Sequence, residues 1–189
     1  MKLFGAVAVL VAGAGAWAGD GGQPSKRVVR ACLNPGANGS MMYRGLATAA
    51  QILKQAGILL DWRSNESACA GGSGFVVRIS RETPMKQHPD ALAYAMPFER
   101  TRIVLFYDRV LTAARPALTP YLFGHVLAHE IVHMMQGVEQ HSASGLMKAR
   151  WDNRDYVEMQ RTHLKLTKDD LDLIDRGLEL RASKTVPVE

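Results

Sequence analysis

The apolar residues in the first half of the chain follow strand-like patterns with one helical interruption. Four runs rich in β-formers predict strands, at 27–33 (RVVRACL), 58–64 (ILLDWRS), 74–80 (GFVVRIS) and 102–110 (RIVLFYDRV). Between the first two runs, the apolar residues of 41–55 recur at helical spacing, and Gly57 is well placed to end that helix. Residues 91–96 (ALAYAM) form a short apolar run in a proline-containing loop. We therefore expect a sheet with a short strand at its edge.

The second half of the chain shows helical patterns. The Thr-Pro pair at 119–120 is typical of a helix start with the threonine as N-cap, and Gly137 is typical of a stop, which predicts a helix of about 17 residues. Residues 152–161 and 168–183 also have helical patterning, and Thr167 is a suitable cap for the second of these helices. A sheet followed by helices indicates an α+β fold.

The first eighteen residues are typical of a secretory signal peptide. Lys2 precedes a short apolar run, and in Ala16-Trp17-Ala18 the two alanines supply the small residues of a cleavage site that ends at Ala18. The alternative is an N-terminal membrane anchor, but the run is short, rich in Gly and Ala, and lacks a basic stop-transfer flank. The expected organisation is a signal peptide at 1–18, a flexible leader at 19–26, one domain at 27–184 and a tail at 185–189.

The length and composition fit this organisation. The 189 residues, 47% of them hydrophobic, suffice for one domain with an ordinary core. No later segment is apolar for long enough to cross a bilayer, so we expect an exported monomer, secreted or periplasmic, with no membrane span in the mature chain. The formal charge of +5 is modest, and no run of Lys and Arg interleaves with aromatic residues. We therefore expect no nucleic-acid partner.

Export changes how the two cysteines are interpreted. Disulfides persist in oxidising compartments, so Cys32 and Cys69 are predicted to pair. The bridge would stabilise the fold by about 4 kcal/mol on the chain-entropy estimate. The alternative is a pair of buried free thiols.

The strongest chemical signal is His129-Glu130-Ile131-Val132-His133 on the predicted helix of about 17 residues. Residues four apart on a helix project side by side, so the imidazoles of His129 and His133 can bind one zinc ion at about 2.0–2.1 Å. Glu130 then lies beside the ion, where its carboxylate can take a proton from an attacking water. His125 lies roughly 12 Å from His133 along the helix and cannot share that ion. We assign it to a supporting or packing role, while His88 and His163 are expected to be exposed and incidental.

A catalytic zinc usually has three protein ligands. His141 is the first choice for the third, because Gly137 can adopt the positive φ that lets the chain leave the helix and turn back. The alternatives are Glu158 on the helix that follows, and then Asp152 and Asp155.

The motif, the downstream glycine and His141, followed by Ser-Gly-Leu-Met at 144–147, resemble the metzincin zinc peptidases. The spacing differs from the usual one, since Gly137 lies four and His141 eight residues after His133 instead of three and six. The resemblance implies a twisted, mostly parallel sheet with an edge strand, packed on two helices that include the motif helix, and then a Met-turn and C-terminal helices. It also implies that Met147 lies beneath the metal.

Together these features predict an exported zinc metalloendopeptidase acting on peptides or proteins, with Glu130 as general base and the edge strand pairing with the substrate backbone. The walls of its pocket are expected from 81–100 and 142–160, and Tyr156 or a backbone N–H is a candidate oxyanion stabiliser. One alternative is a gluzincin-type peptidase, in which Glu158 is the third ligand. Another is a non-catalytic zinc-binding module of the same fold, although the presence of Glu130 argues against it.

Overall fold

The computed structural model describes residues 27–33, 39–72 and 74–184. The predicted signal peptide, the leader and the tail at 185–189 lie outside the described residues. Five strands form one sheet in the order β2-β1-β3-β5-β4. The strands are β1 (Arg27–Leu33), β2 (Ile58–Arg63), β3 (Phe75–Ser80), β4 (Ala93–Ala95) and β5 (Arg102–Phe106). β4 runs antiparallel to β5 and the other neighbours are parallel, which confirms the predicted mostly parallel sheet with an edge strand.

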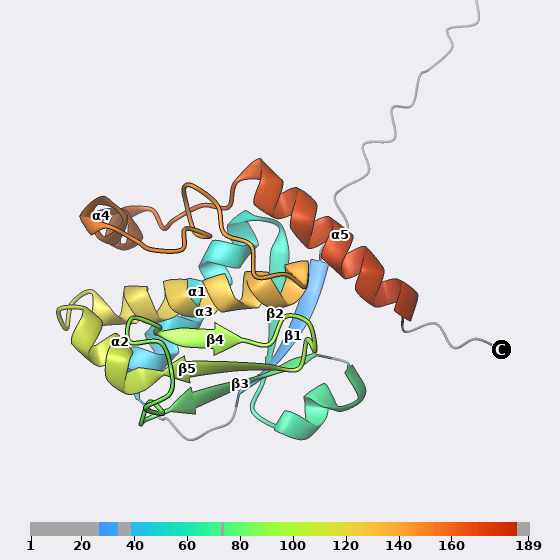
Figure 1. Ribbon diagram of the computed structural model, residues 1–189, viewed down its shortest axis with the longest axis horizontal. Coiled ribbons are helices and arrows are strands. Elements are labelled where there is room, and N and C mark those ends of the chain that lie inside the picture. The colour runs from blue at the N-terminus through green and yellow to red at the C-terminus, as the bar shows by residue number, and fades with distance from the viewer. Residues whose placement is uncertain (1–26, 34–38, 73, 185–189) are drawn as a thin grey trace, which may run out of the picture.

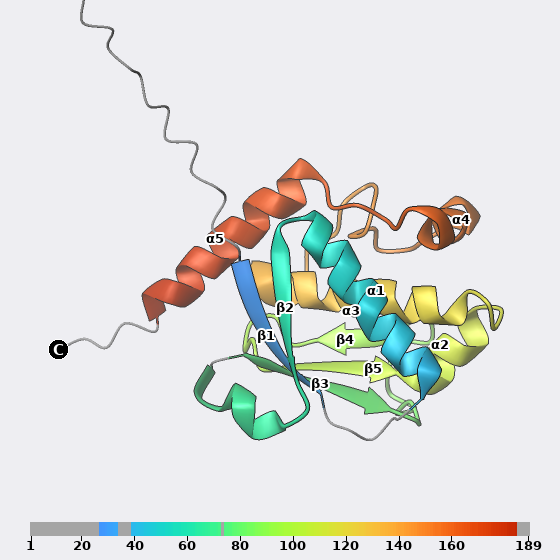
Figure 2. The same ribbon diagram turned by 180° about the vertical axis from the view of Figure 1, so that it is seen from behind.

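The helices lie largely to one side of this sheet (Figure 1). They are α1 (Ser40–Gln55), α2 (Tyr107–Ala113), α3 (Thr119–Gln136), α4 (Asn153–Arg161) and α5 (Lys168–Lys184), and a 3-10 helix, η1 (Glu66–Gly72), follows β2. α1 and α3 run side by side, with α1 behind α3 in Figure 1 and in front of it in Figure 2. None of the described helices is both long enough and apolar enough to span a bilayer.

α3 is the central helix of the core. Sixteen of its eighteen residues are buried, as expected for a helix that is apolar on nearly all sides. It contacts α1, α2, α4 and α5 as well as β4 and β5. On the α1 side the backbones approach closely, because a Cβ added at Gly124 would lie 2.5 Å from the Thr48 Cβ. The candidate metal ligands of α3 are therefore carried by a helix that is held from several directions.

The disulfide joins η1 to the sheet. Cys32 and Cys69 are bonded, as predicted. Val29 and Ala31 of β1 belong to the helix-covered core, and side chains alternate along a strand, so Cys32 projects from the opposite face of the sheet. η1 was not predicted from the sequence, and the bridge anchors it against that second face.

The predicted strand at 102–110 is too long. β5 ends at Phe106 and α2 begins at Tyr107. The carboxylate of Asp108, in the first turn of α2, accepts hydrogen bonds from the backbone N–H and the hydroxyl of Thr83 at 3.1 and 2.8 Å. The residues of this contact are far apart in sequence, so the spacing of apolar residues gives no sign of it. The run is rich in β-forming residues, and we therefore predicted a strand across the start of α2.

The predicted N-cap of the motif helix is also wrong. Thr119 is the first residue of α3, Leu118 occupies the N-cap position, and no side chain caps the helix. The Thr119 hydroxyl instead donates to the carbonyl oxygen of Arg115 at 3.1 Å, within the preceding turn. The predicted stop is correct, since Gly137 is the C-cap in the left-handed conformation.

Candidate metal centre

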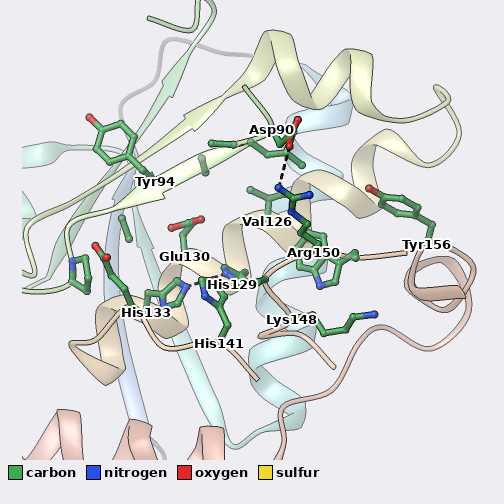
Figure 3. A pocket seen from close by; sticks show the side chains of 18 residues that line it. Asp90, Tyr94, Val126, His129, Glu130, His133, His141, Lys148, Arg150 and Tyr156 are labelled. Carbon is green, nitrogen blue, oxygen red and sulfur yellow. Dashed lines mark hydrogen bonds and ion pairs between the residues drawn. The ribbon is translucent and has the colours of Figure 1, made fainter. Parts of the chain in front are cut away.

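His129 and His133 lie one turn apart on α3, and both side chains are almost fully buried. Their ring centroids are 4.7 Å apart. Figure 3 shows the two imidazoles side by side, with His141 approaching them from the loop after α3. The helical spacing read from the sequence therefore brings the first two rings together.

Two backbone carbonyls fix the protonation pattern of these rings. The Nδ1 of His129 lies 2.9 Å from the Leu146 oxygen, and the Nδ1 of His133 lies 3.0 Å from the Val138 oxygen. A carbonyl oxygen can only accept, so each Nδ1 carries the proton and donates it. Each Nε2 is then left with a free lone pair, and the two Nε2 atoms face each other at 3.0 Å.

This donor set suits a metal cation. Two unprotonated ring nitrogens cannot hydrogen-bond to each other, whereas an ion between them would satisfy both lone pairs. Two nitrogens bound tetrahedrally to one zinc ion lie roughly 3.3–3.4 Å apart, close to the separation seen here. The ligand nitrogens of His129, His133 and His141 all lie within 4.8 Å of one another. Three neutral imidazoles are a common ligand set for zinc.

Burial and the neighbouring rings keep His129 and His133 neutral. Burial, with a smaller contribution from the neighbouring His133, lowers the pKa of His129 to about 3. Burial likewise lowers the pKa of His133 to about 4, with a contribution from His141. Neutral imidazole is the form that binds metals, so at neutral pH these ligands do not have to lose a proton first.

The chain returns to the two rings through a turn at Gly137. This residue has a φ of 72°, and its N–H donates to the His133 carbonyl oxygen at 2.8 Å. His141, eight residues after His133, is an exposed member of the histidine group. The longer interval before the third histidine thus remains compatible with a compact triad.

A second turn follows His141 and brings Met147 into the core. Gly145 has a φ of 74°, and the Met147 carbonyl oxygen accepts the Ser142 N–H at 2.8 Å. The Leu146 N–H donates to the Lys165 carbonyl oxygen at 2.8 Å, while the Leu146 carbonyl holds His129. Met147 is fully buried. This loop therefore supports a helical ligand as well as carrying the third histidine.

Glu130 lines the same pocket and points toward the space beside the two imidazoles (Figure 3). Burial, with a smaller contribution from the negative charge of Glu139, raises the pKa of its carboxyl to about 8. A cation held by the histidines would act in the opposite direction and favour the carboxylate. The protonation state of Glu130 therefore depends on whether a cation is bound beside it.

The pocket has a volume of about 610 Å³. One wall is β4 with the residues before it, and the other is the segment after Met147 together with Tyr156, in agreement with the predicted wall segments. Asp90 and Arg150, from opposite walls, form an exposed ion pair at 3.3 Å (Figure 3). Besides the histidines and Glu130, the charged and aromatic residues that line the pocket are Asp90, Tyr94, Glu139, Lys148, Arg150, Trp151 and Tyr156.

The alternative third ligands have other surroundings. The described histidine group includes no carboxylate, and Glu158 is exposed on α4 outside the pocket lining. Asp152 is the N-cap of α4 and forms a capping box with Asp155. Both aspartates also pair with Lys148. Asp152 and Asp155 therefore hold Lys148, in the loop after Met147, against the start of α4.

His125 has a structural role. Its Nδ1 lies 2.7 Å from the Tyr121 carbonyl oxygen, and its Nε2 accepts the Leu164 N–H at 3.1 Å. Both ring nitrogens are therefore occupied within the protein, in agreement with the packing role assigned from the sequence. His88 is exposed as expected, but His163 is half-buried and its ring centroid lies 5.4 Å from that of His125. The expectation that His163 is exposed is wrong, because the chain after α4 folds back onto α3.

Several pocket residues were not predicted individually from the sequence, although most of them lie within the predicted wall segments. Glu139, Lys148 and Arg150 lie in turns and loops, where no periodic pattern distinguishes a pocket-lining charge from a solvated one. Their proximity to the histidine motif along the chain was the only available signal. Asp90 is farther from the motif in the sequence and lines the pocket on the wall formed by β4 and the residues before it.

No protein-family model and no curated protein matches this chain. Among solved structures, its fold is similar to the crystal structure of archaemetzincin from Methanopyrus kandleri, with a TM-score of 0.55 and 13% sequence identity. The match covers 83% of this chain and 98% of that chain. At this identity the likeness concerns the fold alone, and the chain is therefore similar in fold to an archaemetzincin.

Proposed function

We propose that this protein is an exported zinc-dependent metallopeptidase, with His129, His133 and His141 as metal ligands and Glu130 as general base. The observation that carries the proposal is the pair of free Nε2 lone pairs facing each other beside a third imidazole and a carboxylate in one pocket. The archaemetzincin-like fold supports it. Export rests on the signal-peptide pattern at 1–18, and the disulfide is compatible with an oxidising compartment.

A bound zinc ion would polarise the scissile carbonyl and make an attacking water more acidic. Glu130 takes the proton of that water and later delivers it to the leaving amine. Burial raises the pKa of this carboxyl and a bound cation would lower it, so the two effects oppose each other at the group that makes both transfers. Removal of the carboxylate should therefore slow the reaction strongly while leaving the metal site intact.

The edge of the sheet provides a place for the substrate backbone. β4 pairs with β5 on one side, and Ala93, Tyr94 and Ala95 also line the pocket. An extended peptide can add to such an edge through main-chain hydrogen bonds, which leaves its side chains to select for sequence. Peptides and proteins are accordingly the proposed substrates. By analogy with the metzincins, the buried Met147 is proposed as the base of the metal site.

The first test compares Glu130→Gln with Glu158→Gln in purified mature protein. We expect wild type and both variants to contain one zinc per chain. Cleavage of a generic denatured protein should fall by about 10²–10⁴-fold in Glu130→Gln, because the proton acceptor is lost. Glu158→Gln should cleave as wild type does, since Glu158 lies outside the pocket.

Other outcomes would change the assignment. Cleavage at the wild-type rate by Glu130→Gln would refute the general-base role. Loss of zinc from Glu158→Gln but not from His141→Ala would indicate the gluzincin arrangement. Stoichiometric zinc in a wild-type protein that cleaves no peptide would favour a non-catalytic zinc-binding module.

A further inference from the structure

A buried carboxylate outside the pocket contacts the loop that carries His141. Asp170 lies in the first turn of α5 and is only 2% exposed. A buried charge is costly unless hydrogen bonds compensate it, so the partners of Asp170 indicate its role. They lie on three separate segments of the chain.

The first partner explains how α5 begins. One carboxylate oxygen, Oδ2, accepts the Thr167 N–H at 2.8 Å and the Thr167 hydroxyl at 2.7 Å. In return the Asp170 N–H donates to the Thr167 hydroxyl oxygen at 3.2 Å. This is a reciprocal cap of the kind that commonly opens helices. It uses Oδ2 and leaves the other oxygen, Oδ1, available.

Oδ1 accepts the hydroxyl of Ser142 at 2.5 Å. Ser142 directly follows His141, and the start of α5 does not require this contact. The third link is the Asp170 carbonyl oxygen, which accepts the side-chain amide of Gln136 at 3.2 Å. Gln136 is the last residue of the motif helix. Asp170 thus contacts the residues directly before and directly after the loop 137–141, which leads from the end of α3 to His141.

His141 depends on such support more than the other two histidines do. The rings of His129 and His133 are each held by a backbone carbonyl. His141 is exposed, and in the part of the chain that the structure describes its side chain has no hydrogen bond of this kind. Its position is therefore set by its backbone, and Ser142 is the adjacent anchor.

We propose that Asp170 is a positioning residue for the metal site, which acts through the Ser142 hydroxyl to hold His141 at a fixed distance from the two helical ligands. The proposal rests on the metal site proposed above but not on peptidase activity. Groups that orient metal ligands typically change metal affinity by about 10–100-fold when they are removed. The long interval between His133 and His141 would otherwise leave the third ligand loosely placed.

The test measures zinc affinity by competition with a chromophoric chelator and the absorption spectrum of the Co²⁺-substituted protein. Ser142→Ala removes the hydroxyl and leaves the Thr167–Asp170 cap intact. We expect zinc affinity about 10-fold weaker than in wild type and an altered Co²⁺ spectrum. The metal-free variant should remain folded but melt at a lower temperature, because the buried Asp170 carboxylate loses a hydrogen-bond partner. Ser142→Thr keeps a hydroxyl and should restore the affinity. Ser144→Ala is the matched control, because Ser144 is exposed in the same loop.

Asp170→Asn is the second variant. The amide replaces one of the two acceptor oxygens by an NH2 group and removes the charge, so the hydrogen bonds to Ser142 and Thr167 become weaker. This change should weaken zinc binding and also lower the melting temperature. Wild-type affinity and spectrum in Ser142→Ala would overturn the positioning role. Equal weakening in Ser144→Ala would overturn it too, because any change in the loop would then suffice. Absence of zinc from wild type would instead refute the metal site itself.

Discussion

At the scale of single residues, hydrogen-bond partners decide what each histidine can do. His129 and His133 give their Nδ1 protons to carbonyl oxygens and keep Nε2 free. His125, on the same helix, has both nitrogens occupied by the Tyr121 carbonyl and the Leu164 N–H. The spacing in the sequence excluded His125 from the metal, and its two partners explain why the helix has a third buried imidazole.

The burial of His125 predicts an acid sensitivity. Burial lowers its pKa to about 4 from 6.5 in a model peptide, and the nearby His163 contributes. As pH falls through this window the unfolded chain binds the proton first, so the free energy of unfolding falls between pH 6.5 and 4, by up to about 3 kcal/mol from this residue. His125→Gln should be less stable at pH 7 but should lose less stability on acidification.

Urea unfolding of both metal-free proteins at several pH values measures this difference. His129 and His133 also have lowered pKa values and remain in both proteins, so only the difference between the two profiles reports on His125. Parallel profiles from pH 7 to pH 4 would contradict the prediction.

At the scale of elements, local sequence signals predicted most helices and strands, and two short elements were missed. α1 was recognised from apolar spacing and Gly57, and α3 from the Thr-Pro pair at its start and Gly137 at its end. α2 and η1 were missed because tertiary contacts determine them, the Asp108–Thr83 pair in one case and the disulfide in the other. The helical part of the metal site was readable for the same reason that its helix was.

The end of α3 supports a prediction about the chain reversal toward His141. Gly137→Ala places a side chain at a φ of 72° and drives its Cβ into the Arg100 guanidinium. Gly57→Ala is the matched control, because Gly57 has a φ of 75° but nothing lies within 4 Å of an added Cβ. We expect Gly57→Ala to cost about 1–2 kcal/mol from backbone strain. Gly137→Ala should cost more and should also weaken zinc binding.

Chemical denaturation and zinc titration of both variants check this prediction. Equal losses of stability would mean that the Arg100 side chain moves aside without cost. Unchanged zinc affinity in Gly137→Ala would show that the turn does not set the position of His141.

At the scale of the whole molecule, the site joins distant parts of the chain. One pocket brings together residues of the sheet edge, the motif helix and the segment after Met147. Asp170 of α5 lies outside this pocket and accepts a hydrogen bond from Ser142, next to His141. The sequence alone predicted the layers of the fold and the local histidine pair. It could not predict the Ser142–Asp170 contact or the Asp90–Arg150 pair, because each joins segments whose separation in space depends on the complete fold.

The disulfide gives a prediction at this scale. The bridge closes a loop with a sequence separation of 37, so replacing both Cys32 and Cys69 by Ala should lower the free energy of unfolding by about 4 kcal/mol on the chain-entropy estimate. The bridge lies on the sheet face away from α3, so zinc affinity of the folded variant should equal that of wild type. A reductant should destabilise wild type and leave the variant unaffected; zinc loss from the folded variant would contradict the separation of bridge and site.

The contrast between a buried motif helix and an exposed third histidine has a consequence for the order of events during metal capture. Backbone amides of α3 are enclosed on several sides and should be among the slowest in the protein to exchange hydrogen with solvent, whereas those around His141 should exchange early. An arriving ion would therefore meet two imidazoles fixed on a buried helix and a third that solvent also reaches. Release of the metal should begin at His141, and if Asp170 positions this residue, loss of the Ser142–Asp170 contact should speed release more than it slows capture.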